Sequence, residues 1–227
     1  MLWAFNSCGL SGYGAGRTLR NLVFASIVLA APAYAETVTV AALGDSLTAG
    51  YGLPQGDGFV PQMQAWLTAH GADVVLVNAG VSGDTTAGGL ARTDWTLTPD
   101  VDGVIVALGG NDFLRGIDPA NSRHNLRGIL EAAKGKAVPV LLVGIVAGSN
   151  YGPEFKQAFD TMYPDLAAEY GAALYRDWFS GLVVDGNMQG ARDNYLQSDG
   201  IHPNAEGVKL IVEAMGPAVL DLIEQAE

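Results

Sequence analysis

The stretch "TVTVAALGDSLTAG", residues 37–50, passes from a buried strand into a helix. Residues 37–43 are a continuous apolar and β-branched run, which is typical of a strand buried on both faces of a sheet. Gly44 ends the run, and the polar residues after it favour the start of a helix. A strand that leads directly into a helix is the repeating unit of a parallel α/β sheet.

The same alternation continues to the end of the chain. Four further apolar runs predict strands: 73–79, 103–108, 138–146 and, more weakly, 172–175. Stretches with helical periodicity lie between and after the strands: 59–71, 121–136, 153–171 and 204–227. The order predicts a three-layer α/β/α domain, with helices on both faces of a parallel sheet and right-handed crossovers.

Length and composition agree with one such domain. The chain has 227 residues, of which 16% are charged and 30 are glycine, as expected for a compact domain with many tight turns. The formal net charge of −12 argues against nucleic acid as a partner. The only cysteine, Cys8, lies near the N-terminus, so the body of the chain has no disulfide or thiolate chemistry.

The N-terminal residues are typical of an export signal. Arg17 and Arg20 precede "NLVFASIVLAAPAYA", an apolar run that is short for a membrane span and ends in small residues. We expect cleavage after Ala35, so that 1–35 is an extension plus signal peptide and 36–227 is a single periplasmic or secreted domain. An uncleaved membrane anchor is the alternative. Residues 1–16 fit neither pattern, and are either an extension or a mis-assigned start.

Polar residues follow the predicted strands, at the edge of the sheet where reactive groups gather in parallel α/β proteins. Ser46 follows the first strand and is the candidate nucleophile, because a helix start favours developing negative charge. In "SDGIHP", residues 198–203, His202 can act as general base and Asp199 can orient it, with Pro203 in the first turn of the last helix. The alternatives are that Ser46 only caps a helix and that "SDG" is only a turn.

Acyl transfer also requires hydrogen-bond donors for an oxyanion. The candidates are the backbone N–H of Ser46, the backbone N–H of Gly83 and the carboxamide of Asn111. Gly83 and Asn111 are also residue types that populate turns. Asp45 and Asp112 flank these residues and are expected to be helix caps.

These short motifs resemble a known family. "GDSL" with Ser46, "SGDT" with Gly83, "GGND" with Asn111 and "DGIHP" with Asp199 and His202 resemble, in order, the four sequence blocks of the SGNH hydrolases, also called GDSL esterases. Longer stretches, such as "NAGVSGDTTAGGLAR", are similar to the exported bacterial branch of acyl-CoA thioesterases, lysophospholipases and arylesterases. The resemblance implies a flavodoxin-like five-stranded sheet of order 2-1-3-4-5, a Ser46–His202–Asp199 triad and the three-donor oxyanion hole.

The sequence thus predicts a serine hydrolase that cleaves small-molecule carboxylic esters and thioesters through an acyl-enzyme on Ser46. A carbohydrate O-acetyl esterase and a non-catalytic binding module on the same fold are the alternatives. Residues on the loops near Ser46 are candidates for the acyl pocket: Leu47, Phe113, Leu114, Ser149 and Tyr151. We expect no cofactor and no metal, since the three histidines lack ligand spacing, and we expect a monomer that contacts lipid substrates transiently.

Overall fold

The computed structural model describes residues 37–183 and 188–227. The predicted signal peptide, the extension 1–16 and the cleavage point after Ala35 lie outside the described residues. Among the residues that are described, no helix is long and apolar enough to cross a membrane.

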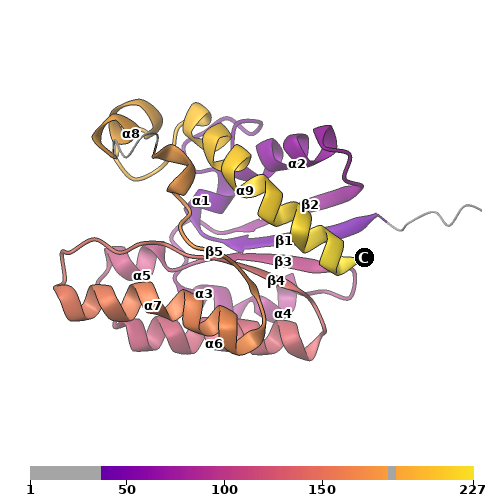
Figure 1. Ribbon diagram of the computed structural model, residues 1–227, viewed down its shortest axis with the longest axis horizontal. Coiled ribbons are helices and arrows are strands. Elements are labelled where there is room, and N and C mark those ends of the chain that lie inside the picture. The colour runs from indigo at the N-terminus through magenta and orange to yellow at the C-terminus, as the bar shows by residue number, and fades with distance from the viewer. Residues whose placement is uncertain (1–36, 184–187) are drawn as a thin grey trace, which may run out of the picture. The chain divides into compact units, whose positions relative to one another are not determined.

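A parallel sheet forms the centre of the domain, and its strand order is β2-β1-β3-β4-β5, as the resemblance predicted (Figure 1). The strands are β1 (Val38–Gly44), β2 (Val74–Gly80), β3 (Gly103–Ala107), β4 (Val140–Val143) and β5 (Ala173–Tyr175). β1 and β3 are almost wholly buried, which agrees with their continuous apolar sequences.

The strand β4 is shorter than the predicted run 138–146, for reasons that lie in its two flanks. Val138 donates its N–H to Ala133 O at 3.0 Å and so closes the end of the preceding helix. Gly144 bonds to Tyr175 O at 2.8 Å and accepts from Trp178 N at 2.9 Å, so the chain beyond Val143 follows the segment after β5. The apolar residues 144–146 thus belong to a loop, in which Ile145 is buried and Val146 is exposed.

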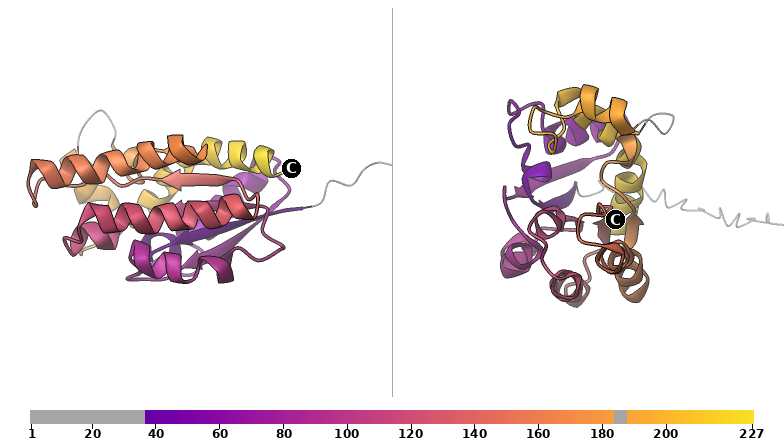
Figure 2. Two further views of the ribbon diagram at one scale, coloured as in Figure 1. Left: turned by 90° about the horizontal axis from the view of Figure 1, so that it is seen from below. Right: turned by 90° about the vertical axis from the view of Figure 1, so that its left-hand side faces the viewer.

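Helices cover both faces of the sheet, so the predicted three-layer α/β/α arrangement is confirmed (Figure 1). One face carries α2 (Phe59–Ala69) and α9 (Ala205–Ala226), which approach closely where Gly216 faces Trp66. The other carries α6 (Pro119–Gly135) and α7 (Pro153–Tyr170), which run side by side in Figure 2, together with α3 (Thr86–Ala91) and α4 (Thr93–Thr96).

In the part of the chain that the structure describes, four more short helices follow strand ends or lie between β5 and α9: α1 (Ser46–Ala49), α5 (Gly110–Leu114), the 3₁₀ helix η1 (Ser180–Leu182) and α8 (Met188–Tyr195). Apart from a helix start at Ser46, the sequence did not predict them. Elements of three to eight residues are too short to display a helical period. They shape the edge of the sheet at which the candidate residues lie.

Candidate active site

Ser46, His202 and Asp199 form a continuous hydrogen-bonded row. Ser46 is the first residue of α1, directly beyond the end of β1, and its Oγ lies 2.8 Å from His202 Nε2. His202 Nδ1 lies 2.7 Å from Asp199 Oδ2. The structure therefore brings the three predicted residues together although Ser46 and His202 are 156 positions apart in the chain.

A tight turn fixes the direction of the Asp199 carboxylate. Its Oδ1 accepts the backbone N–H groups of Ile201 at 2.9 Å and His202 at 3.0 Å, which leaves Oδ2 facing the imidazole. Gly200, between them, has φ +68, a conformation that favours glycine. Both carboxylate oxygens are thus committed, one to the turn and the other to the ring.

The hydrogen bonds around Asp199 outweigh its partial burial. Burial raises the pKa of this carboxyl, but the hydrogen bonds from the His202 side chain and from the backbone N–H groups of Ile201 and His202 lower it to about 2. Asp199 is therefore ionised at any pH near neutrality, when it can accept a hydrogen bond from His202 Nδ1 and hold Nε2 free of its proton towards Ser46.

The expected place of Pro203 was wrong. The last helix begins at Ala205, and its N-cap is Asn204, whose side chain accepts the N–H of Gly207 at 2.9 Å. Pro203 precedes that cap and pairs with Leu196 in an antiparallel bridge. With Pro203 in the first turn, His202 would have been the N-cap of the helix. The bridge between Pro203 and Leu196 instead closes the loop that carries Asp199 and His202.

Two of the three predicted oxyanion donors are backbone N–H groups. The N–H of Ser46 is at the first position of α1, where a helix has no internal acceptor for it. Within the described part of the chain, the N–H of Gly83 has no hydrogen-bond acceptor, and Gly83 and Ser46 line one groove with His202. Gly83 has φ +87, while the nearest atom to an added Cβ is 3.7 Å away, so the backbone conformation requires the glycine rather than lack of space.

Asn111 supplies the third predicted donor, and its carboxamide is already oriented. The residue lies in α5, the first helix after β3, and Nδ2 donates to Asp84 O at 2.9 Å and to Asp45 Oδ2 at 3.3 Å. The contact with Asp84 is the stronger one by length. The hydrogen that faces Asp45 makes the longer contact, and is therefore the one available to an oxyanion in the groove while the other stays bonded to Asp84 O.

The two flanking acids differ in what they cap. Asp45 is the N-cap of α1, as expected, and its Oδ1 accepts the N–H of Leu47 at 3.0 Å. Asp112 does not cap its own helix, because it lies inside the first turn of α5. It is fully buried and accepts from Thr86 N at 2.8 Å, Thr86 Oγ1 at 2.6 Å and Ser122 Oγ at 2.7 Å, so it joins α5 to α3 and α6.

Burial changes the ionisation of Asp45. Only 2% of the residue is exposed, and this burial raises its pKa from 3.8 to about 6. The hydrogen bond from Leu47 N–H, the charge of His202 and the hydrogen bond from Asn111 act in the opposite direction and are too weak to cancel the effect. A carboxyl that is costly to ionise therefore lies next to Ser46.

A largely apolar groove of about 820 Å³ opens beside Ser46 and His202. Of the five predicted pocket residues, Leu47, Phe113 and Leu114 line it. Ser149 and Tyr151 do not. Ser149 is exposed and its carbonyl closes a turn with Gly152 N at 3.2 Å, while the Tyr151 ring packs edge-on against Phe113 and its hydroxyl donates to Leu114 O.

Sequence reasoning missed much of the groove. The Tyr51 ring lies 4.7 Å from the His202 ring, and its position after Gly50, which ends α1 at φ +83, was the available signal. The remaining apolar lining comes from the loop after β4 and from the connection between β5 and α9: Ile145, Val146, Ala147, Phe179, Leu182, Val183, Ala191, Leu196 and Ile201. Scattered apolar residues in connections carry no local pattern that predicts a cavity.

Neither the groove nor its surroundings resemble a metal centre. In residues 37–183 and 188–227, no group of three or more His, Cys, Asp or Glu side chains is arranged to hold a metal ion.

A doubly wound sheet of order 2-1-3-4-5 with a serine, a histidine and an aspartate in one row at its carboxyl edge defines the class of SGNH-type serine hydrolases. Residues 42–210 match the model of the GDSL-like lipase/acylhydrolase family, and the chain belongs to that family.

Relatives match over nearly their whole length. The chain is 38% identical to esterase TesA of Pseudomonas aeruginosa over 88% of this chain and 95% of the relative. It is 33% identical to thioesterase 1/protease 1/lysophospholipase L1 of Escherichia coli over 89% and 93% of the two chains. The crystal structure of AlinE4, an SGNH-hydrolase family esterase, is 42% identical and aligns with a TM-score of 0.66 over 82% of this chain and 97% of its own. The protein is a serine ester hydrolase.

Proposed function

We propose that the protein cleaves carboxylic esters and thioesters through an acyl-enzyme on Ser46. The observation that carries the proposal is the row in which Ser46 Oγ is 2.8 Å from His202 Nε2 and Nδ1 is 2.7 Å from Asp199. One relative is named an esterase, and the name of the other includes thioesterase and lysophospholipase. These names support the two substrate classes.

Acylation begins with proton transfer. His202 Nε2 accepts the hydroxyl proton as Ser46 Oγ forms a bond to the carbonyl carbon of the substrate. Asp199, ionised and bonded to Nδ1, holds the ring in the required tautomer and stabilises the imidazolium that forms. The electron pair of the carbonyl moves to its oxygen, which becomes an oxyanion.

Three donors then stabilise that oxyanion: the backbone N–H of Ser46, the backbone N–H of Gly83 and Nδ2 of Asn111. They come from the ends of three neighbouring strands, β1, β2 and β3, so the sheet sets their separation before substrate binds. Asp84 O, which accepts from Asn111 at 2.9 Å, keeps the carboxamide in place during the reaction.

The leaving group departs next. The carbonyl re-forms, the bond to the alcohol or thiol breaks, and His202 gives its proton to the departing oxygen or sulfur. A water molecule then repeats the sequence on the acyl-enzyme: His202 removes its proton, the oxyanion forms again, and Ser46 regains a proton as the acid is released.

The groove indicates that the acyl chain is the part of the substrate that determines specificity. Its lining is mostly apolar, and Leu47, Phe113 and Leu114 lie in it close to Ser46 in sequence or at the end of β3. Burial of an acyl chain contributes roughly 0.8 kcal/mol per methylene, which an acetyl ester of a carbohydrate cannot supply. We therefore place fatty acyl esters and thioesters ahead of carbohydrate O-acetyl esters.

Transient contact with lipid substrates is consistent with the edge of the groove. Several large apolar residues that line it are strongly exposed: Tyr51, Leu114, Val146 and Ile201. We propose that they touch a lipid aggregate while a single acyl chain enters.

We also propose that the enzyme acts as a monomer and that it is exported with Glu36 as its first residue. Light scattering of the secreted protein tests the monomer, and Edman sequencing tests the first residue.

Fluorophosphonate labelling with peptide mapping tests the nucleophile. The label should attach to the peptide that contains Ser46, and Ser46→Ala should lose both the label and hydrolysis of p-nitrophenyl esters. A label on another residue, or full ester hydrolysis by the variant, would refute the mechanism. A series of p-nitrophenyl esters of rising chain length, compared with acetylated glycans, decides between the two substrate classes.

A further inference from the structure

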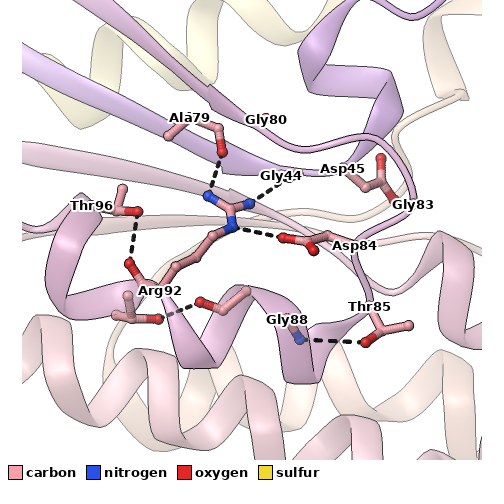
Figure 3. Close-up of polar contacts among 12 residues, drawn as sticks. Gly44, Asp45, Ala79, Gly80, Gly83, Asp84, Thr85, Gly88, Arg92 and Thr96 are labelled. Atoms are coloured by element: carbon pink, nitrogen blue, oxygen red, sulfur yellow. Dashed lines mark hydrogen bonds and ion pairs between the residues drawn. The ribbon is translucent and has the colours of Figure 1, made fainter.

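Arg92 lies at the break between α3 and α4, and its backbone is fixed by both helices (Figure 3). Its N–H donates to Gly89 O at 3.3 Å, and its carbonyl accepts from Thr96 N at 3.0 Å and from Thr96 Oγ1 at 3.1 Å. The side chain therefore leaves a rigid corner and extends to the carboxyl edge of the sheet.

The guanidinium group contacts three separate segments, one through each nitrogen (Figure 3). Nε donates to Asp84 Oδ2 at 2.6 Å, Nη1 to Ala79 O at 2.7 Å and Nη2 to Gly44 O at 2.8 Å. Only 22% of the Arg92 side chain and 19% of the Asp84 side chain are exposed. Short, partly desolvated contacts of this kind are stronger than an ion pair on the surface.

Each partner is next to a proposed oxyanion donor. Gly44 is the last residue of β1, two positions before Ser46. Ala79 lies at the end of β2, from which the chain turns to Gly83. Asp84 follows Gly83 directly, and its carbonyl accepts from Asn111 Nδ2 at 2.9 Å. One cation thus links the supports of all three donors.

The intervening sequence is shaped to allow this arrangement. Thr85 caps α3 by accepting the N–H of Gly88 at 3.4 Å. A Cβ at Gly88 would lie 2.5 Å from Oδ1 of Asp84, so a side chain there would displace the carboxylate that Arg92 binds. The stretch "GDTTAGGLAR", residues 83–92, therefore contains the proposed donor Gly83 and the carboxylate of Asp84 that Arg92 binds. It also contains Gly88, which leaves room for that carboxylate, and Arg92 itself.

We propose that Arg92 is a positioning residue for the oxyanion hole, acting on Ser46 through Gly44 and on Gly83 and Asn111 through Asp84. It does not touch the substrate, since it is not part of the lining of the groove. A lysine cannot replace it, because a single ammonium cannot make three bonds in the fixed planar directions of a guanidinium. The inference rests on the proposed acyl-transfer function of the same site.

The test compares Arg92→Ala and Arg92→Lys with a matched control, Arg123→Ala. Arg123 also forms a 2.6 Å ion pair, with Asp165, but that pair joins α6 to α7 away from the groove. Both Arg92 variants should lower kcat for a p-nitrophenyl ester by about 10- to 100-fold, with KM changed less than about threefold, and should slow fluorophosphonate labelling equally. The control should stay within about twofold of the parent enzyme.

A second measurement separates positioning from a general loss of stability. If Arg92 acts through the donors, Asn111→Ala should cost much less in an Arg92→Ala background than in the parent, because the hole is already misplaced. The inference would be overturned if the losses of Arg92→Ala and Asn111→Ala simply multiply in the double variant. A kcat of Arg92→Ala within twofold of the parent, or an equal loss in Arg123→Ala, would also overturn it. Should Arg92→Ala not fold, Arg92→Lys is used in both measurements with the same criteria.

Ser46→Ala distinguishes a failure of the proposed function from a failure of the proposed role of Arg92. If that variant loses activity while Arg92→Ala behaves like Arg123→Ala, the acyl-enzyme mechanism stands and the role of Arg92 fails. If Ser46→Ala retains activity, the proposed function itself fails.

Discussion

Replacing Asp45 by Asn should change how the stability of the protein depends on pH. Burial raises the pKa of Asp45 from 3.8 to about 6, a shift of about 2 units. Each unit corresponds to about 1.36 kcal/mol, so the shift amounts to about 3 kcal/mol. Asp45 is only 2% exposed, so solvent screens this effect little.

The sign follows from where the proton is held. Between about pH 4 and pH 6 the folded protein keeps the proton on Asp45, whereas the unfolded chain releases it. The free energy of unfolding therefore falls as the pH rises through this window, by about 3 kcal/mol from this group alone. Asparagine does not titrate, and its side-chain oxygen can still accept the N–H of Leu47.

At each pH, the unfolding free energy of the parent is subtracted from that of Asp45→Asn. We expect this difference to become more positive by about 3 kcal/mol between pH 4 and pH 7. Urea unfolding at pH 4, 5, 6 and 7 measures it, and contributions from other titrating groups cancel in the difference. Leu47→Ala, a neighbouring change without a titratable group, should show a difference that is independent of pH.

The variant should also lose activity. Its amide places a donor opposite Asn111 Nδ2, which lies 3.3 Å from Asp45 Oδ2 in the parent. A difference in unfolding free energy that stays constant from pH 4 to 7, or that moves against the variant, would refute the assigned burial cost.

Three further outcomes are expected. Asn111→Ala should reduce turnover by about 100- to 1,000-fold, or about 3 to 4 kcal/mol of transition-state stabilisation, with thermal unfolding nearly unchanged; a loss below threefold would remove Asn111 from the mechanism. Asp199→Asn should reduce kcat by on the order of 10⁴-fold, and by the same factor from pH 6 to 9, because the pKa of Asp199 near 2 keeps the parent carboxylate ionised throughout. Ala191→Phe, which adds a ring to the groove, should lower the ratio of dodecanoyl to butyryl ester hydrolysis by about tenfold, while equal losses on both esters would show that Ala191 does not limit chain length.

The layers of the fold could be predicted because long elements carry clear periods. Each of the four long helices begins and ends within two residues of its predicted range, and Gly71 and Gly171 mark two of the ends with φ +85 and +69. The strand order came from the family resemblance, since apolar runs alone do not specify which strands are neighbours. The short helices α3 and α4 were missed because six and four residues cannot show a helical period.

The reactive residues were predictable for a different reason. Ser46 lies two residues after β1 and Asn111 four residues after β3, and parallel strands bring their carboxyl ends to one edge whatever their separation in sequence. His202 and Asp199 lie on a loop, where local spacing suffices to pair them. The wall of the groove formed by Phe179 and Ala191 was not predictable, because its residues depend on how one long connection folds back over the sheet.

The presence of an aspartate at position 45 is explained by the site and not by the fold. A serine or threonine would cap α1 equally well without a carboxyl that resists ionisation next to Ser46. Neither hydroxyl residue has a second oxygen, whereas Asp45 accepts Leu47 N–H through Oδ1 and Asn111 Nδ2 through Oδ2. At neutral pH the ionised Asp45 leaves the folded state about 3 kcal/mol less stable than a side chain protonated there would. Asp45 therefore lowers stability at the position that connects the proposed nucleophile to a proposed oxyanion donor. Such a loss of stability is expected where a residue is retained for the chemistry of a site.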